Sequence, residues 1–374
     1  MRIALVHPYP WPEVRRGAER YVEDLTVHLA ASGHQVTVIT ATRGRPGRTT
    51  RPDGAAVWQV RHLPPGPLHR LGVGEVETFG LGALVALLRR QVDVVHALTP
   101  TAALAGRLAG RPTVYSVLGH PSPEQLPVAA VPRRLFVAAA RSATVTAALS
   151  QASQQALAAT TGRVGLVLPP GVRLERFPPA ADPRCGPPRL LFSASLHDRR
   201  KRLDLVLGAV DRLLDRHPQL RLALSGQGDA AAALAGCPPR VRAVVDPLGP
   251  GDPDEVPGRY RQATVTVLPA DHEAFGLVLV ESLASGTPVV CGPGGGMAEI
   301  VTPAVGRVAA ASTAGAVAEA VDQAIALAGQ LSTSARCVQR AADWDWDGVV
   351  GPAHRRLYAA LAAGRPAPAG EGTW

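Results

Sequence analysis

Lys201 is the first candidate for a chemical role, because it is the only lysine in this 374-residue chain. The other 38 residues that carry a fixed positive charge are arginines. Asparagine is absent, and we infer a coding bias that replaces lysine by arginine wherever a positive charge alone suffices. A lysine retained against that bias indicates a site that needs a compact ammonium group on a flexible stem. Lys201 lies in a predicted strand-to-helix loop, where phosphates are commonly held. A solvated basic turn is the alternative interpretation.

A second constellation is the pair of carboxylates at Glu273 and Glu281. A predicted strand ends at Pro269, a short loop presents Glu273, and a helix opens near Gly276. The helix N-terminus offers free N–H groups and partial positive charge to an anion, which a glycine lets approach closely. Glu281 follows roughly 7 Å further along the helix, so the two carboxylates could bind hydroxyls on either side of a diphosphate. Alternatively, Glu273 stabilises the helix dipole and Glu281 is a solvated residue.

The elements that must position these residues alternate between strands and helices, which predicts parallel sheets covered on both faces. Apolar periodicity and turn residues predict the element boundaries. Strands are expected at 3–6, 35–40, 56–60, 92–96, 113–117, 144–148, 165–168, 189–194, 221–225, 241–245, 264–268 and 288–291, and helices at 18–32, 78–90, 202–216, 276–285, 314–328, 333–342 and 347–362.

The chain is long enough for two domains, and a proline-rich segment at 169–188 interrupts the alternation. We predict that this segment links a first domain at 1–168 to a second at 189–345. Each is expected to be an α/β domain with a doubly wound, Rossmann-like sheet. Ligands of such folds bind beyond the carboxyl ends of the strands, so a central cleft faced by both domains is the predicted site.

Composition limits the partners and the compartment. The formal net charge of +9 favours anionic ligands, nucleic acid or an anionic membrane surface. No basic block is interleaved with aromatic residues, which argues against nucleic acid. The four cysteines show neither a CxxC pair nor a zinc spacing, and no run of 18 apolar residues occurs. The first apolar run is too short for a signal peptide, so a cytoplasmic protein is expected.

Several segments together resemble one known family. EAFGLVLVE (273–281), SLASGTPVV (282–290) and GPGGGMAEIV (292–301) resemble the signature of the retaining glycosyltransferases of family 4, which have the GT-B fold. The resemblance covers nearly the whole chain and includes segments 16–40, 93–97, 168–177, 200–210, 225–229 and 344–358. The last of these resembles the family's closing helix, so residues 346–374 are expected to cross back to the first domain.

The resemblance implies that the second domain binds a nucleotide-sugar donor. Lys201 would contact the donor diphosphate and stabilise the leaving group, and Glu281 would bind the ribose hydroxyls. Glu273 would orient the transferred sugar. The remaining donor-binding residues implied in this domain are Arg200, Phe275, Gly276 and Leu277. The family usually has an arginine where Ser195 stands; either Arg199 or Arg200 would replace it, or the chain would belong to a subgroup that uses the lysine alone.

In the first domain, the resemblance implies that the loop at Gly17 approaches the diphosphate. The family also has a histidine that faces the reacting sugar, and His120 is the candidate for this catalytic role. His96, at a predicted strand end, is the alternative, with a structural role preferred for it. Arg16 and Pro170 stand where the family often has glycine and asparagine.

The resemblance implies no metal and no cofactor beyond the nucleotide-sugar co-substrate, for which a UDP-sugar is favoured. The acidic segment 343–347 resembles a metal-nucleotide motif of another fold, but its late position favours an N-cap at Asp347 and tryptophans packed between domains. The glycine-rich segment 292–296 is not followed by the Lys-Ser/Thr of a nucleoside triphosphatase. It is expected to let the phosphate or sugar of the donor approach closely.

These features predict a retaining glycosyltransferase that moves a sugar to an acceptor hydroxyl, in a bacterial natural-product or cell-envelope pathway. The acceptor is expected to be a small molecule or lipid-linked, with the basic surplus allowing peripheral contact with the inner face of the membrane. A nucleotide-sugar epimerase or a phosphorylase on the same scaffold is the alternative. A non-catalytic protein that binds nucleic acid is a remote third.

Overall fold

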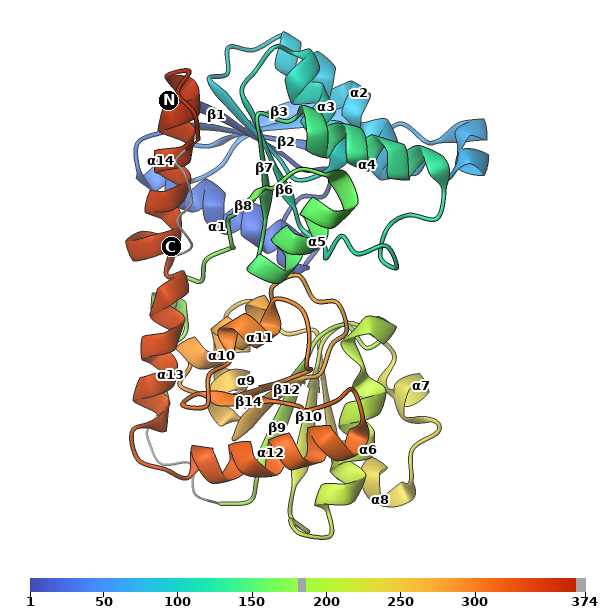
Figure 1. Cartoon of the computed structure of the whole chain (residues 1–374), viewed down its shortest axis with the longest axis vertical. Coiled ribbons are helices and arrows are strands. Elements are labelled where there is room, and N and C mark those ends of the chain that lie inside the picture. The colour runs from blue at the N-terminus through green and yellow to red at the C-terminus, as the bar shows by residue number, and fades with distance from the viewer. Residues whose placement is uncertain (181–185, 368–374) are drawn as a thin grey trace. The chain divides into compact units, whose positions relative to one another are not determined.

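The computed structural model describes residues 1–180 and 186–367 and contains two compact units. Unit 1 comprises Met1–Gly171 and the chain from Trp346 onward, and unit 2 comprises Val172–Asp345 (Figure 1). Residues 181–185 of the expected linker, with Cys185, and residues 368–374 lie outside the described residues.

Unit 1 is built on an eight-stranded sheet of order β3-β4-β2-β1-β5-β6-β7-β8. Every pairing is parallel except that of β3 with β4. Because both faces of the parallel strands are covered, β1, β5, β6 and β7 are almost entirely buried. The strands are β1 Arg2–Val6, β2 Gln35–Thr42, β3 Gly47–Thr50, β4 Ala56–Arg61, β5 Val94–Ala97, β6 Thr113–Val117, β7 Val145–Ala148 and β8 Leu166–Val167.

The helices of unit 1 cover the sheet in two groups. Figure 1 shows α1 and α14 on one side of the strands and α2, α3 and α4 on the other. The helices are α1 Gly17–Ala31, α2 Glu75–Leu88, α3 Pro100–Leu108, α4 Ala130–Ser142, α5 Gln151–Thr161 and α14 Gly351–Ala362.

The C-terminal segment is tied to unit 1 by a buried network of aromatic and histidine side chains. The hydroxyl of Tyr21 lies 2.7 Å from Nε2 of His354, which is fully buried, and the ring of Trp346 stacks on that of Tyr21. His96 lies between the hydroxyls of Tyr358 and Ser116, at 2.6 and 2.7 Å. Burial lowers the pKa of His354 to about 4 and that of His96 well below its ordinary value. Both rings are therefore neutral parts of the packing.

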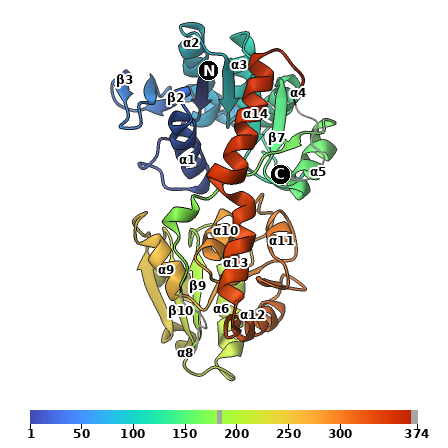
Figure 2. The same cartoon turned by 90° about the vertical axis from the view of Figure 1, so that its left-hand side faces the viewer.

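Unit 2 is built on a six-stranded, wholly parallel sheet of order β11-β10-β9-β12-β13-β14. Helix α6 packs against α12, and α10 packs against α9 and α13 (Figure 2). The strands are β9 Arg189–Ser193, β10 Arg221–Ser225, β11 Val245–Gly249, β12 Val265–Leu268, β13 Val289–Cys291 and β14 Gly306–Val308. The helices are α6 Leu203–Leu213, α7 Ala230–Leu234, α8 Pro239–Arg242, α9 Val256–Gln262, α10 Leu277–Ala284, α11 Met297–Ile300, α12 Ala314–Ala328 and α13 Thr333–Ala341.

One expected strand is wrong. Residues 241–245 were expected to be extended, but Pro239–Arg242 forms the short helix α8 and the strand begins only at Val245. Pro238 and Pro239 favour a helix start, since proline fits the first helical turn. Val241 is fully buried from that helix, which produced the apolar pattern of a strand.

Strands β3 and β14 were not predicted from the sequence, and the N-cap expected at Asp347 is wrong. Strand β3 is short, fully exposed and pairs only with β4, so it lacks an apolar pattern. Asp347 does not cap α14, whose N-cap is Val350; its carboxylate instead lies 3.0 Å from Nδ1 of His28. Trp346 is buried inside unit 1, whereas Trp344 packs in unit 2.

Candidate functional site

The loop between β9 and α6 holds Lys201 at the end of a single 3-10 turn, Arg199–Lys201. The carboxylate of Asp198 caps this turn by accepting the backbone N–H of Arg200 at 3.1 Å. Arg202 follows in the left-handed region, with φ of 53°, and is the N-cap of α6, which begins at Leu203. Left-handed backbone is costly for a residue with a side chain, so the surrounding contacts must hold this loop in shape.

Those contacts join the Lys201 loop to the loop that follows β12. Arg202 donates to the carboxylates of Asp204 and Asp271, at 2.9 and 2.8 Å. The backbone N–H of Asp271 donates to the carbonyl of Arg200 at 2.8 Å. The two strand-end loops therefore form one rigid assembly.

The ammonium group of Lys201 and the carboxylate of Glu273 meet in this assembly. Lys201 Nζ donates to Glu273 Oε2 in a direct ion pair. The two side chains are only 19% and 22% exposed, so the pair is largely removed from water. Partial burial makes the pair stronger than a surface ion pair and makes each partner costly to leave alone. The structure thus brings together two residues that stand 72 positions apart.

Arg200 lies beside this ion pair but is directed to Asp198. Its guanidinium group forms a two-pronged contact with that carboxylate, at 3.0 and 2.7 Å. Hydrogen bonding to Asp198 raises the pKa of Arg200, and the charge of Glu273 adds to this effect. Arg200 is therefore a fixed positive charge near Glu273.

The N-terminus of α10 lies directly after Glu273. Gly276 is the N-cap, with φ of 104°, a conformation that favours glycine. A Cβ at this position would lie 2.7 Å from Cγ of Met297, so the missing side chain makes room for Met297. Among the described residues, none accepts a hydrogen bond from the backbone N–H groups of Phe275, Gly276 or Leu277. These donors and the helix dipole could bind an anion.

The glycine-rich segment at 292–296 supports the Glu273 loop. Gly296 donates its backbone N–H to the carbonyl of Glu273 at 2.9 Å. Gly295 has φ of 74°, and a Cβ there would lie 2.5 Å from the same carbonyl oxygen. Gly295 therefore lets two segments of the backbone approach each other. From the sequence, segment 292–296 was expected to let the donor approach closely.

Glu281 is buried, with 4% of its surface exposed. Its Oε2 accepts a hydrogen bond of 2.8 Å from the hydroxyl of Tyr260 on α9, and that hydroxyl also lies 3.4 Å from Oγ of Ser193 at the end of β9. A buried carboxylate needs such donors, and a nucleoside hydroxyl is a further donor of the same kind.

Two residues of α9, Tyr260 and Arg259, contact the residues around Glu281 and the ends of the neighbouring strands. Neither was among the site residues predicted from the sequence. Tyr260 orients Glu281, and Arg259 donates to Oγ of Ser225 at 2.8 Å and to the carbonyl of Gly249 at 2.7 Å. Arg259 therefore closes the carboxyl ends of β10 and β11. The only signal in the sequence was a short polar helix between two strands, which is common on any surface.

The residues expected from the first domain lie in unit 1. Gly17 is the first residue of α1, and a Cβ there would meet no atom within 4 Å. His120 is half-buried and its Nδ1 lies 3.2 Å from Oγ of Ser153. His96 is fully buried between Tyr358 and Ser116, as a structural histidine would be. The structure groups Lys201, Arg200, Glu273, Phe275–Leu277 and Glu281 in unit 2, and their chemical roles remain predictions.

Neither a metal cluster nor a membrane span emerges from the part of the chain that the structure describes. Within residues 1–180 and 186–367, no three His, Cys, Asp or Glu side chains are grouped so that they could hold a metal ion. No helix in these ranges combines the length and apolar character needed to cross a bilayer.

Comparison with known families gives two matches that together cover most of the chain. The family model "Glycosyltransferase Family 4" matches residues 15–176, and "Glycosyl transferases group 1" matches residues 180–344. A D-inositol 3-phosphate glycosyltransferase of Acidothermus cellulolyticus is 31% identical over 76% of this chain and 72% of the relative. A D-inositol 3-phosphate glycosyltransferase 1 of Catenulispora acidiphila is 32% identical over 78% of each chain. A D-inositol 3-phosphate glycosyltransferase of Corynebacterium jeikeium is 34% identical over 35% of this chain and 36% of the relative.

Solved structures share the fold over nearly the full chain. The sucrose-phosphate synthase of Thermosynechococcus elongatus superposes with a TM-score of 0.80 at 21% identity, covering 96% of this chain and 99% of that one. The Anabaena HepE protein in complex with UDP and glucose superposes with a TM-score of 0.73 at 20% identity, covering 96% and 100%. At these identities the likeness establishes the fold alone, namely two parallel-sheet α/β domains.

Proposed function

Since the chain belongs to glycosyltransferase family 4 and is a glycosyltransferase of the GT-B type, we propose that it is a retaining enzyme that uses a nucleotide-sugar donor. The sugar is transferred to an acceptor hydroxyl without a metal ion or another cofactor. Unit 2 binds the donor, and unit 1 binds the acceptor.

The observation that carries this proposal is the Lys201–Glu273 pair beside the N-terminus of α10. A nucleoside diphosphate leaving group gains negative charge as the bond to the sugar breaks. Lys201 and the N–H groups of Gly276 and Leu277 are fixed donors that can stabilise this charge. The backbone N–H groups are already in place, so they need little reorganisation when the charge develops, whereas Lys201 must turn from Glu273 to the diphosphate.

We propose the remaining roles from the chemistry of the side chains and from the family resemblance. Glu281 accepts hydrogen bonds from the ribose hydroxyls, and Tyr260 holds its carboxylate in position. Glu273 binds hydroxyls of the transferred sugar and releases Lys201 to the diphosphate. His120 of unit 1 and the loop at Gly17 contact the sugar and the diphosphate in this proposal.

The reaction is proposed to proceed on one face of the sugar. The acceptor oxygen forms a bond to the anomeric carbon on the side from which the diphosphate leaves. The bond between that carbon and the diphosphate oxygen breaks, and its electron pair stays with the leaving group. The acceptor proton passes to a phosphate oxygen of the leaving group, so the protein needs no nucleophile of its own.

The comparisons support a UDP-sugar as the first donor to test, since the solved HepE structure holds UDP and glucose. The relatives named D-inositol 3-phosphate glycosyltransferase support a polyol or a sugar as the acceptor. We place the activity in a bacterial natural-product or cell-envelope pathway, on the cytoplasmic side of the membrane.

Unit 1 also offers a surface for peripheral membrane contact. Leu81, Val85 and Leu88 are exposed on α2, at spacings that place them on one face of the helix. With the net charge of +9, this face supports binding to an anionic bilayer that carries a lipid-linked acceptor. Replacing Leu81 and Leu88 by serine should abolish flotation with phosphatidylglycerol vesicles, whereas Leu108→Ser, at another exposed leucine, should not. Equal flotation of all three proteins would contradict the membrane proposal.

Donor binding is tested with a thermal-shift panel of UDP-, GDP-, dTDP- and ADP-sugars. The correct donor should raise Tm by binding the folded state, and Lys201→Ala should remove the shift. Arg212→Ala is the matched control, since it removes an exposed positive charge from α6 in the same unit. If Lys201→Ala and the control gave the same shift, Lys201 would not bind the donor.

Product analysis then separates transfer from the alternatives. With the correct donor and acceptor, nuclear magnetic resonance of the product should show the anomeric configuration of the donor sugar. An epimerase would convert the donor in the absence of any acceptor, and a phosphorylase would need phosphate. Either of those results, or an inverted product, would contradict a retaining glycosyltransferase.

A further inference from the structure

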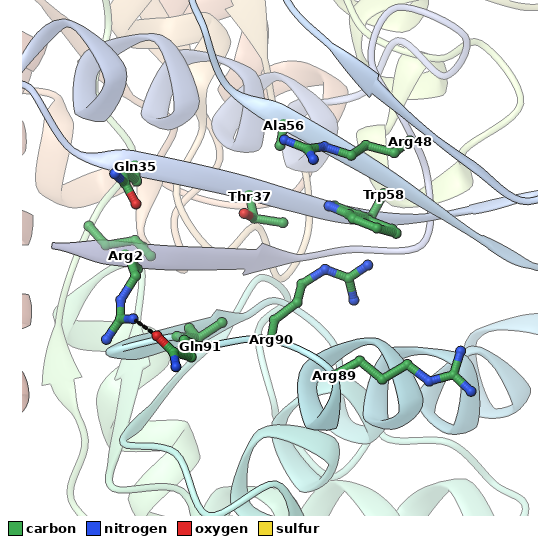
Figure 3. Close-up of a pocket in the computed structure, with 11 residues that line it drawn as sticks. Arg2, Gln35, Thr37, Arg48, Ala56, Trp58, Arg89, Arg90 and Gln91 are labelled. Carbon is green, nitrogen blue, oxygen red and sulfur yellow. Dashed lines mark hydrogen bonds between the residues drawn. The ribbon is translucent and has the colours of Figure 1, made fainter.

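A cavity in unit 1 is lined by arginines at the edge of the sheet where the parallel strands begin. It has a volume of about 320 Å³ and lies among the first residues of β1, β2 and β4, strand β3 and the segment that follows α2 (Figure 3). Its charged lining consists of Arg2, Arg48, Arg89 and Arg90. Donor ligands of such folds are expected beyond the opposite, carboxyl ends of the strands, so this arginine cavity is a separate feature.

Within residues 1–180 and 186–367, a carboxylate neutralises only one of the four arginines. Arg2 forms an ion pair with Asp93, with a shortest distance of 2.6 Å, and donates to Gln91. Among the described residues, no carboxylate forms an ion pair with Arg48, Arg89 or Arg90, and none lines the cavity.

A paired arginine in the same unit shows the contrast. Arg51 binds Glu23 at 2.6 Å and Asp53 at 2.9 Å, and so shares its charge between two carboxylates. The three unpaired arginines of the cavity repel one another instead, because nothing of opposite charge separates them.

Trp58 holds two of these arginines in place. The guanidinium carbon of Arg90 lies 3.3 Å from the centre of the Trp58 ring, and that of Arg48 lies 5.7 Å from it. Figure 3 shows Arg48 and Arg90 on opposite sides of the ring, with Thr37 beside it. Stacking on an aromatic ring fixes the planes of the two groups while leaving their N–H edges to bind another partner.

Arg90 is also incompletely satisfied. Its Nε is buried without a hydrogen-bond partner, while another of its nitrogens donates to the carbonyl of Ala86. Burial, with the nearby charges of Arg48 and Arg89, lowers the pKa of Arg90. A buried donor without an acceptor is costly, so an anion that entered the cavity would remove this cost as well as the repulsion.

We propose that the arginine cavity binds a phosphate ester or a diphosphate, as a second ligand site in addition to the donor site. Phosphate oxygens match the paired N–H groups of guanidinium, and their negative charge would neutralise the three arginines. The volume is at the lower end of small-molecule sites, which suits a compact phosphorylated molecule. The side chains of Gln35 and Thr37 supply neutral hydrogen-bonding groups for the rest of that ligand.

The proposal is tested on the full-length protein with inorganic pyrophosphate and glycerol 3-phosphate as probes, in calorimetric titrations. Arg48→Gln combined with Arg89→Gln should weaken binding at least about tenfold for each arginine. Both side chains are exposed, so the variant should fold normally, and an unchanged Tm checks this. Arg133→Gln with Arg134→Gln removes the same charge from exposed positions on α4 and should leave the affinity unchanged.

Two further measurements identify the site and the source of the phosphate. Lys201→Ala should retain the cavity binding, and Trp58→Phe should lose the fluorescence change that accompanies it. Phosphatidylglycerol vesicles, tested in parallel, would bind in place of the soluble probes if a lipid headgroup is the natural source. Loss of either kind of binding in the Arg48→Gln, Arg89→Gln protein supports the proposal. Absence of binding, or binding that depends on Lys201 and not on Arg48 and Arg89, overturns it.

Discussion

Replacing Lys201 by arginine is the sharpest perturbation of the proposed donor site, because this chain uses arginine for every other basic residue. The substitution keeps the positive charge and changes only its shape. A guanidinium group can still form an ion pair with Glu273, so the fold should retain its stability. The same group is larger and planar, and it cannot place a single compact charge where the ammonium group lies.

The expected magnitudes follow from burial and from the role of the charge. The Lys201 and Glu273 side chains are 19% and 22% exposed, so Lys201→Ala should cost about 1–3 kcal/mol in the free energy of unfolding by leaving Glu273 unpaired. Lys201→Arg should cost less than about 1 kcal/mol. Loss of a fixed donor to the developing charge should lower kcat by about 10²- to 10³-fold in both variants.

The assay combines urea unfolding with steady-state kinetics at saturating donor and acceptor. Lys201→Arg should separate the two readouts, with stability kept and turnover lost. The control Arg212→Ala should change neither the stability nor the turnover. If Lys201→Arg turned over within a few-fold of the unmodified protein, the requirement for an ammonium group would be refuted.

Three further predictions concern positions that the structure singles out. Gly276→Ala should lower the free energy of unfolding by about 2–4 kcal/mol, because φ is 104° and the new Cβ would meet Met297. Met297 is fully buried, so Met297→Ala destabilises the protein by itself; in a double-mutant cycle followed by urea unfolding, the double variant should lose less than the sum of the two single losses, and additive losses would rule out the steric explanation. Tyr260→Phe should raise KM for the donor more than it lowers kcat, since Glu281 loses the donor that orients it; an unchanged KM would separate Tyr260 from donor binding. The pKa of His354 is about 4 when folded and 6.5 when unfolded, so the unfolded chain binds more protons between these values; the contribution of His354 to stability should be complete above pH 6.5 and fall by about 3 kcal/mol as the pH drops to 4, and His96, whose pKa is also lowered, should add to the loss. Urea unfolding across this range should show that loss, with a smaller slope in His354→Gln, and a flat profile would contradict it.

Most of the fold could be predicted from the sequence because strand and helix periodicities differ and prolines and glycines mark the boundaries. Helix α12 was predicted with the bounds that the structure shows, and α13 within one residue at its C-terminus. Short elements escaped prediction: β3 has four residues, all exposed, and β14 is only three residues long. For Pro239–Arg242, a buried valine in a short helix gave the same apolar pattern as a strand.

The candidate site could be predicted only in part. Lys201 was conspicuous by its rarity, and Glu273 by its place before a helix, but nothing in the sequence indicated that they form an ion pair across 72 residues. Tyr260 carries no pattern that distinguishes it from a core tyrosine. The arginine cavity was not predicted at all, since Arg48 and Arg90 come from separate elements and meet only at Trp58.

The central claim is that one diphosphate is bound by Lys201 and the N-terminus of α10. A crystal structure of the full chain with UDP, or with the nucleotide that the thermal-shift panel selects, tests it directly. The account predicts phosphate oxygens within hydrogen-bond distance of Lys201 Nζ and of the backbone N–H groups of Gly276 or Leu277, with the ribose at Glu281. A nucleotide whose phosphates lie away from both groups would contradict the account.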